Sequence, residues 1–475
     1  MGASGRATRL ALTLALALAP ALALRAPGDN RPNVVLFYPD TLRAEAFGTY
    51  GHPLSKTPNF DALASQGVTF ESAHVQHTQC APSRCALFTG RYMHVLGHRT
   101  QTHLVRSYED NLFKYLKRAN YTTILLGKND VLAADSFNSS LSFWQGTIGV
   151  SEGPSNFTRP GRAGYYSFAG TAGPCKGTNA ACNGDLKAVE DSVAFFNSGD
   201  SLPEPFFLFL PGIGAHPPYG APSDFFASYT SDQVRAAAPL RQLVPGNAKP
   251  GHLQPTGITG FRNLTSFHDE GDDELFYELA AVYLGRIAYV DYVLGVLMRG
   301  LDASPIVGRT ALIAHSDHGD YGGDWQAVEK WPGAVDDVLT RVPLLARVPG
   351  GAGGLRVATP VMSIDLMPTI LELAGIALSN ISSVQFGVSL LPWLVNGTAP
   401  ANPHKWVFSE GGYSNWMEYE PASTQTHPTH PPARPPLTLD NPSWALGNLS
   451  RPSTERPAAG VYVRGPHKPL LPAWP

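Results

Sequence analysis

CAPSRCALFTGR, residues 80–91, is the stretch around which the rest of the chain is organised. It opens with a cysteine, a rigid proline, a serine and an arginine, and it continues into a short apolar run of helical character. Arg84 follows Cys80 by one helical turn, so its guanidinium can reach back toward the sulfur and toward anions beside it. We interpret Cys80 as a nucleophile and Arg84 as its electrostatic support. A buried structural cysteine at a helix start is the alternative.

Four apolar runs, one before this stretch and three after it, each deliver polar residues at their ends. These runs read as buried strands, and the carboxyl ends of parallel strands meet at one edge of a sheet, where ligands bind. We therefore expect the polar residues to converge although nearly 280 positions separate the first from the last. The pairs are Asn33–Tyr38 with Asp40, Thr122–Leu126 with Lys128, Phe206–Leu210 with His216, and Thr310–Ala314 with Asp317 and His318.

Helical patterns alternate with these runs, which predicts an α/β fold whose sheet is covered on both faces. Apolar residues recur at helical spacing in Thr57–Gln66, Asn111–Arg118 and Glu274–Leu301, and we assign these helices to packing. Residues 212–272 are rich in Pro, Gly and His, so we expect an irregular excursion over the site that makes substrate contacts. Residues 398–475 are proline-heavy and show few clear elements.

The composition excludes some functions. A chain of 475 residues with 43% hydrophobic composition can build a large core in one big domain or two. Its 35 basic and 38 acidic residues give a net charge of −3. This balance offers no electrostatic case for binding nucleic acid or an anionic membrane surface.

The N-terminus has the pattern of a targeting segment. Arg6 and Arg9 precede the apolar run Leu10–Leu24, and Ala21-Leu22-Ala23 suits a signal peptidase. We predict a signal peptide over residues 1–23 and no stable membrane span after it. The alternative is an uncleaved anchor, because the run could just cross a thin bilayer.

Sequons and cysteines favour a secretory route that ends outside the cell or in the lysosome. Cys175 and Cys182 are close enough to form a disulfide within their own loop, and Cys85 would remain a buried free thiol. Chance triplets in a bacterial export protein are the alternative. Seven asparagines open N-x-S/T sequons and are candidates for glycosylation: Asn120, Asn138, Asn156, Asn263, Asn380, Asn396 and Asn448.

The 80–91 stretch resembles the sulfatase signature C-x-P-S-R-x-x-L-x-T-G-R at every fixed position. The resemblance implies an alkaline-phosphatase-like fold with a large mixed, mostly parallel sheet sandwiched by helices, and a catalytic domain over residues 31–375. It also implies a smaller C-terminal α+β subdomain over 398–475, which we expect to be incomplete. The resemblance is weaker in this subdomain, where it rests on KWVFSEGG (405–412) and VYVRGPHK (461–468).

The resemblance further implies a divalent cation. Asp40 and Thr41 stand where sulfatases carry two aspartates, so one carboxylate has become a hydroxyl, and Asp317 and His318 match the far half of the cation site. With the modified Cys80 these residues are the expected ligands. Oxygen-rich ligation with one imidazole suits Ca²⁺, with Mg²⁺ or Mn²⁺ as alternatives. The neighbouring histidines 74, 77, 94, 98 and 315 show no ligand spacing for a second metal, and we expect structural or substrate-contact roles for them.

Three more residues complete the expected site. Lys128 matches the lysine of the sulfatase GKWH segment, but here the segment reads GKND and Asp130 replaces the usual histidine. His216 in AHPPY resembles the family histidine that faces the leaving group, and Lys330 resembles the lysine before the R-V-P-L strand. A solvated loop histidine and a surface lysine are the alternatives for these two positions.

These matches imply that a formylglycine-generating enzyme converts Cys80 to formylglycine. One deprotonated hydroxyl of the aldehyde hydrate would attack sulfur and expel the alcohol, leaving a sulfated enzyme. The second hydroxyl would then expel sulfate while the aldehyde re-forms. The expected activity is hydrolysis of a sulfate monoester, of a sulfated glycan or a small aryl sulfate. The alternatives are a phosphonate or phosphate ester hydrolase of the same superfamily, and a catalytically silent protein that binds sulfated glycans.

Overall fold

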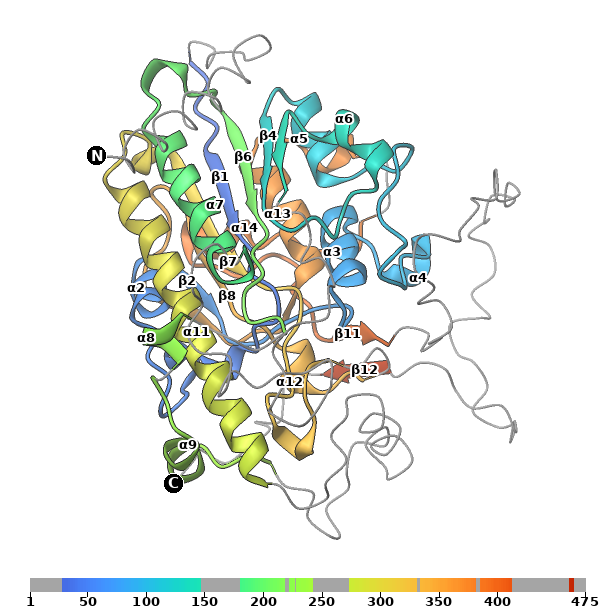
Figure 1. Ribbon diagram of the computed structural model, residues 1–475. Coiled ribbons are helices and arrows are strands. Elements are labelled where there is room, and N and C mark those ends of the chain that lie inside the picture. Colours follow the sequence, from blue (N-terminus) through green and yellow to red (C-terminus); the bar gives the residue numbers. More distant parts are fainter. Residues whose placement is uncertain are drawn as a thin grey trace, which may run out of the picture.

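The protein is built on one large twisted sheet, seen edge-on in Figure 1. The computed structural model describes residues 28–146, 180–217, 222–226, 228–241, 273–330, 334–381, 385–411 and 461–464. Eight strands of this part form the sheet in the order β5-β4-β6-β1-β7-β8-β2-β9. They are β1 Asn33–Phe37, β2 Val68–Phe70, β4 Thr122–Leu126, β5 Phe143–Gln145, β6 Phe206–Leu210, β7 Thr310–His315, β8 Leu344–Arg347 and β9 Leu355–Val357.

The centre of the sheet is parallel. In β1, Val35 pairs with Leu208 of β6 on one side and with Leu312 of β7 on the other, and both pairings run parallel. β4 extends the parallel set beyond β6, whereas β8 runs antiparallel to both β7 and β2. The expected α/β fold with a mixed, mostly parallel sheet is confirmed. All four strands that precede the candidate site residues therefore end at the same edge.

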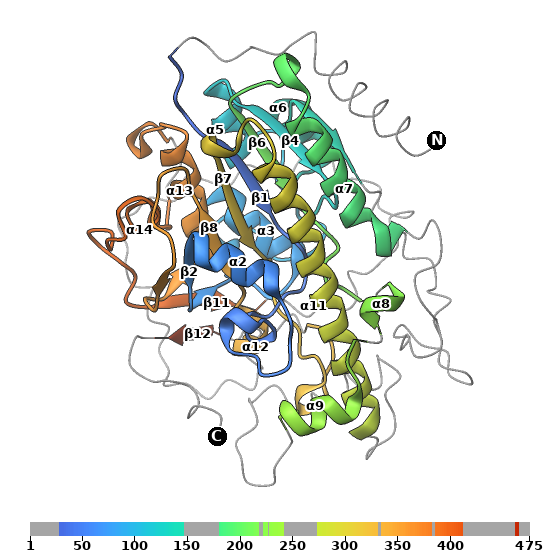
Figure 2. The same cartoon turned by 90° about the vertical axis from the view of Figure 1, so that its left-hand side faces the viewer.

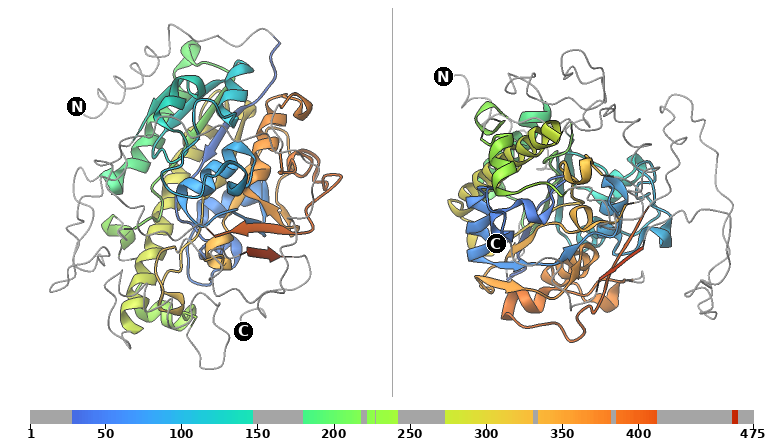
Figure 3. Two further views of the ribbon diagram at one scale, coloured as in Figure 1. Left: turned by 90° about the vertical axis from the view of Figure 1, so that its right-hand side faces the viewer. Right: turned by 90° about the horizontal axis from the view of Figure 1, so that it is seen from below.

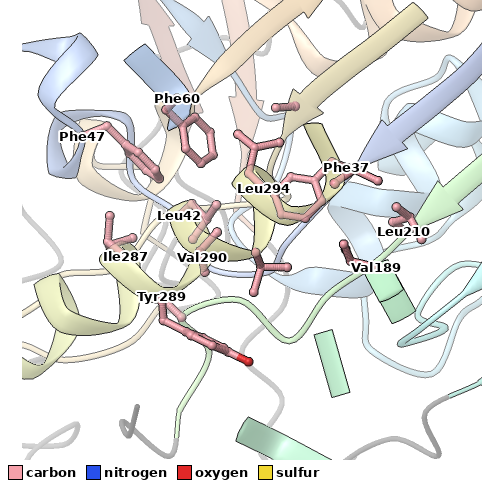
Figure 4. Packing of buried hydrophobic residues seen from close by; sticks show 14 of the residues in the cluster. Phe37, Leu42, Phe47, Phe60, Val189, Leu210, Ile287, Tyr289, Val290 and Leu294 are labelled. Carbon is pink, nitrogen blue, oxygen red and sulfur yellow. The ribbon is translucent and has the colours of Figure 1, made fainter. Parts of the chain in front are cut away.

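Each face of the sheet carries its own hydrophobic core because successive side chains of a strand point to opposite faces. In β1, Val35 and Phe37 belong to one core, and Val34 and Leu36 belong to the other. The first core packs under α2, α7 and α11 (Figures 2 and 4). The second lies under α3, α5, α13 and α14. The bounds are α2 Pro58–Gln66, α3 Cys80–Thr89, α5 Leu112–Arg118, α7 Ala180–Phe196, α11 Asp273–Asp302, α13 Leu366–Leu373 and α14 Leu391–Asn396.

The predicted helices are confirmed with shifts of one residue at their ends. Asn111 lies just outside α5 and caps it, because its side chain accepts a hydrogen bond from the Lys114 N–H. By length and hydropathy, α11 over Phe276–Asp302 could span a membrane, although no such helix was expected there. Yet 83% of the most apolar 18-residue stretch of α11 is buried inside the molecule, as in the core helix of a globular protein.

Residues 212–272 are not wholly irregular, so that prediction was partly wrong. The described part contains two short helices, which pack against α11. At the start of α9 (Ser231–Ala237), the Thr230 side chain and Gln233 form a reciprocal capping box, a local signal that favours a helix. The remaining short elements are β3 Ala73–His74, β10 Val361–Met362, α4 Met93–Leu96, α6 Phe137–Ser140, α8 Ser223–Phe226, α9 Ser231–Ala237 and α12 Asp337–Thr340.

The C-terminal part contributes a separate two-stranded ladder. β11 (Val407–Glu410) pairs antiparallel with β12 (Val461–Arg464), which lies where the strand in VYVRGPHK was expected. Figure 3 shows the two strands, in orange-red and dark red, apart from the large sheet. β11 is tied to the main body because the Glu410 N–H donates to the Gln76 carbonyl. The predicted boundary of a C-terminal subdomain remains a prediction.

Candidate active site

The candidate site lies at the carboxyl edge of the four parallel strands. Lys128, which follows β4, places its Nζ 2.7 Å from Oδ2 of Asp40, which follows β1. The Sγ atom of Cys80 lies 3.6 Å from Asp40 Oδ1, 3.7 Å from Lys128 Nζ and 3.3 Å from Nε2 of His318, which follows β7. Residues far apart in the chain thus surround one sulfur, as the strand-end argument predicted.

Cys80 is the first residue of α3, and only 2% of it is exposed. Gln79 before it is extended, and its carbonyl accepts the first helical hydrogen bond, from Ser83. The positive end of the helix dipole therefore lies at Cys80, where it favours negative charge. Cys80 and Cys85 are both free and buried, so the predicted free thiol at Cys85 is confirmed.

Arg84 is completely buried and joins the two aspartates of the site. Its Nη2 lies 2.8 Å from Asp40 Oδ2, and its Nε donates to Asp317 Oδ2 at 2.9 Å. Burial alone would raise the pKa of Asp40, but the charges of Lys128 and Arg84 outweigh burial and hold it well below its usual range. Asp40 is therefore a carboxylate at neutral pH.

One ligand atom each from Asp40, Cys80, Asp317 and His318 forms a cluster that could hold a metal, with all atoms within 4.8 Å of one another. The Nδ1–H of His318 donates to the Gly319 carbonyl at 2.9 Å, so the lone pair of Nε2 faces the cluster. Two carboxylates and an imidazole suit a divalent cation. The donor set therefore fits the expected cation, without specifying which one.

Thr41 lies beside the cluster in a left-handed conformation, with φ 65°. Its hydroxyl donates to Asp40 Oδ1 at 2.5 Å, and its N–H donates to Asp317 Oδ1 at 3.1 Å. Residues other than glycine rarely adopt this left-handed conformation, and surrounding contacts hold those that do. Thr41 thus orients both carboxylates, and direct ligation by its hydroxyl remains a prediction.

Asp130, which replaces the usual histidine, pairs with Lys128, and the distance from its Oδ2 to Lys128 Nζ is 2.9 Å. Burial would raise the pKa of Asp130, but Lys128 and Arg84 outweigh burial and lower it. The group is therefore a carboxylate that accepts hydrogen bonds. It cannot donate a proton as an imidazolium would.

His216 and Lys330 contact each other. The Nζ of Lys330 lies 2.9 Å from Nε2 of His216, and Nδ1–H of His216 donates to the Pro217 carbonyl. Burial and the charges of Lys330 and Lys128 lower the pKa of His216, so the imidazole is neutral. Although burial lowers the pKa of Lys330, Cys80 and Glu329 outweigh it and raise the pKa. Lys330 is buried and charged, not a surface lysine.

The loop that carries His216 is held by two side chains that sequence reasoning missed, the half-buried Asp185 and the buried Arg286. Asp185 of α7 accepts the N–H groups of Ile213 and Gly214, and Nε of Arg286 in α11 donates to the Gly214 carbonyl at 2.6 Å. Gly214 has φ 57°, and a Cβ there would lie 2.2 Å from the Asp40 carbonyl oxygen. Asp185 and Arg286 carry no motif, so only packing identifies them.

The other histidines near the motifs have structural partners. His315 lies between the Pro343 carbonyl and the Ser363 hydroxyl, and His98 contacts Glu109 and the His103 carbonyl. Within the described ranges, the Asp40 cluster is the one group of metal-ligating side chains.

The predicted modifications can be placed only in part. Asn120, Asn138, Asn380 and Asn396 are exposed, as glycan acceptors must be, whereas Asn156, Asn263 and Asn448 lie outside the described residues. Cys175 and the predicted signal peptide also lie outside them, and nothing is described of the Cys182 side chain. Glycosylation and the Cys175–Cys182 disulfide therefore remain predictions.

Comparison with known proteins links this geometry to one family. The family model described as Sulfatase matches residues 32–376. The choline-sulfatase of Rhizobium meliloti is 25% identical, over 79% of this chain and 73% of that protein, and arylsulfatase A of Bos taurus is 28% identical, over 83% and 73%. The phosphonate monoester hydrolase of Agrobacterium radiobacter has the same fold, with TM-score 0.63, 22% identity and 80% coverage of each chain.

Proposed function

The chain belongs to the sulfatase family, the sulfuric ester hydrolases, and on that premise we propose that it hydrolyses a sulfate monoester. One observation carries the proposal: Cys80 lies at a helix N-terminus within 4 Å of Asp40, Lys128 and His318. We propose a sulfated glycan or an aryl sulfate as the substrate, because the predicted export would bring the protein to such compounds.

We propose that Cys80 acts as formylglycine and that Asp40, Thr41, Cys80, Asp317 and His318 hold a divalent cation, with Ca²⁺ first and Mg²⁺ or Mn²⁺ as alternatives. The modified residue supplies a hydrated aldehyde as nucleophile, and the cation supplies positive charge to sulfate oxygens. The fit of the donor set supports the cation. The helix N-terminus at Cys80 supports an anionic nucleophile.

The chain's own cations would bind the sulfate group. The fully buried Arg84 holds the two aspartates in place, whereas Lys128, whose side chain is 16% exposed, can contact a sulfate oxygen. Lys330 can donate a hydrogen bond to the leaving oxygen as negative charge develops there. Neutral His216 accepts from Lys330 and so keeps the ammonium in position.

We propose the same organisation for the whole chain as its sequence predicts. A signal peptide over residues 1–23 would direct it into the secretory pathway, where a formylglycine-generating enzyme would act on Cys80 before folding buries it. The catalytic domain would span residues 31–375 and a smaller C-terminal subdomain residues 398–475. The final location would be extracellular or lysosomal, and the exposed sequons Asn120, Asn138, Asn380 and Asn396 would carry glycans.

Mass spectrometry of the tryptic peptide that contains Cys80 tests the proposal. Protein made in a host with the maturation system should show loss of the sulfur and gain of an aldehyde. An unmodified thiol would favour the silent glycan-binding alternative. The Cys80→Ala variant should lose activity on an aryl sulfate, whereas Cys85→Ala, which changes the other buried cysteine of the same helix, should retain it.

A paired assay separates the two hydrolase functions. A sulfatase should turn over aryl sulfate faster than an aryl phosphonate monoester of the same leaving group. The opposite order would favour the phosphonate hydrolase, for which the hydroxyl of Thr41 in place of a second carboxylate is the supporting feature. Activity on neither ester, despite an aldehyde at position 80, would contradict both functions.

A further inference from the structure

Each lysine proposed to contact the sulfate group has a carboxylate partner of its own. Lys128 pairs with Asp130 at 2.9 Å, and Lys330 lies 3.4 Å from Oε1 of Glu329, its neighbour in the chain. Neither carboxylate belongs to the Asp40 cluster that could hold a metal. Asp130 and Glu329 therefore reduce the net positive charge around the two lysines that would bind the anion.

The Lys128–Asp130 pair lies where an incoming anion would meet it. Their side chains are 16% and 24% exposed, whereas those of Asp40, Asp317 and Arg84 are fully buried. Because the pKa of Asp130 is lowered, its negative charge is present at neutral pH. The Lys330–Glu329 pair is more deeply placed, with 8% and 12% of its side chains exposed.

Counting charges shows what these acids change. Arg84, Lys128 and Lys330 are cationic, and Asp40, Asp317, Asp130 and Glu329 are anionic. With a divalent cation bound and with His216 and His318 neutral, these groups together carry one net positive charge. Without Asp130 and Glu329 it would carry three. The described site thus matches an anion of one negative charge.

We propose that Asp130 and Glu329 make the site selective for singly charged ester groups, such as sulfate monoesters, over doubly charged phosphate monoesters. The inference rests on the proposed function of the same site. Two charges about 6 Å apart in an effective dielectric of about 20 interact by nearly 3 kcal/mol, or roughly 100-fold in affinity, and solvent at the rim reduces this. Removing either acid should therefore change charge selectivity about tenfold.

Two stable ligands isolate charge from reactivity. Benzenesulfonate carries one negative charge, and phenylphosphonate, above its second ionisation, carries two in nearly the same shape. Neither contains an ester bond, so binding can be followed by calorimetry on Ca²⁺-loaded full-length protein whether or not Cys80 has been converted. The variants are Asp130→Asn and Glu329→Gln. Asp232→Asn, which removes an exposed carboxylate on α9, is the control.

The wild-type protein should bind benzenesulfonate at least as tightly as phenylphosphonate. Asp130→Asn and Glu329→Gln should each shift the affinity ratio about tenfold toward phenylphosphonate, and Asp232→Asn should leave it unchanged. An unchanged ratio in both variants, or equal tightening of both ligands, would overturn the inference. So would failure to bind benzenesulfonate by protein that hydrolyses aryl sulfate. The predicted ratio in protein without sulfatase activity would instead contradict only the proposed reaction.

Discussion

Nζ of Lys330 lies 2.9 Å from Nε2 of His216, so a buried ammonium donates to a neutral imidazole across 114 positions of the chain. The direction of this hydrogen bond is fixed by the other ring nitrogen, whose N–H donates to the Pro217 carbonyl. The positive charge of this pair is on Lys330, and the His216 imidazole is neutral. Substitution of Lys330 should therefore change the pKa of His216, and substitution of His216 should remove the acceptor that holds the Lys330 ammonium.

Lys330→Met should lower kcat/KM on an aryl sulfate about 100-fold, because the charge proposed to stabilise the leaving oxygen is lost. Since Lys330 lowers the pKa of His216, its removal should raise that pKa. The acidic limb of the kcat/KM profile should then move to higher pH. Lys405→Met, at an exposed lysine, is the control, and equal activity of the two variants would contradict the assignment.

Removal of divalent cations with a chelator should destabilise the protein, and Ca²⁺ should restore it. A ligand at 100 times its Kd stabilises the native state by about 2.7 kcal/mol. Asp317→Asn should abolish the Ca²⁺-dependent shift in urea unfolding, because it removes a charged member of the cluster. Asp232→Asn should keep the shift. An Asp317→Asn protein that still responds fully to Ca²⁺ would place the cation elsewhere.

Gly214→Ala should lower both activity and stability, because the new Cβ would lie 2.2 Å from the Asp40 carbonyl oxygen. Gly199→Ala is a matched control: φ is 64° there, close to the 57° of Gly214, but a Cβ would meet nothing within 4 Å. Both variants carry the backbone cost of a left-handed alanine, roughly 1 kcal/mol. Unfolding curves and kcat that agree between the two would show that the close contact has no effect.

Acidification from pH 7 to pH 5 should reduce the free energy of unfolding. Burial lowers the pKa of His315 to about 4, whereas an unfolded histidine titrates near 6.5. Between these values the unfolded state binds more protons, so stability falls as pH falls, by about 2 kcal/mol for this group at pH 5. Urea unfolding of His315→Gln should show a correspondingly shallower decline.

His404 provides a control of opposite sign for the same measurement. Burial lowers its pKa, but the hydrogen bond and charge of Asp365 outweigh burial and raise it. Its stabilising contribution is present below the unfolded pKa and is lost as pH rises through the folded pKa. His404→Gln should therefore make the decline on acidification steeper, and a shallower decline would refute the assigned direction.

Much of the fold followed from local pattern. The strands predicted over Thr122–Leu126 and Phe206–Leu210 have those bounds in the structure, because short apolar runs between turn residues leave one choice of buried strand. The capping box at Thr230 was an equally local signal, and the composition of residues 212–272 obscured it. The polarity of a segment is a weaker guide than the pairing of particular residues within it.

The chain's sequence by itself predicted the candidate nucleophile Cys80, its supporting arginine and the strand ends that deliver Asp40, Lys128 and Asp317, because a contiguous motif, helical spacing and apolar runs are read from neighbouring residues. Only the tertiary structure decided the partners of those groups. Asp185 holds the His216 loop, and Asp130 and Glu329 each pair with a lysine of the site. The protonation of His216 likewise depends on Lys330, 114 positions away. Such partners depend on which side chains packing brings within 4 Å of each other, and no spacing in the sequence encodes that distance.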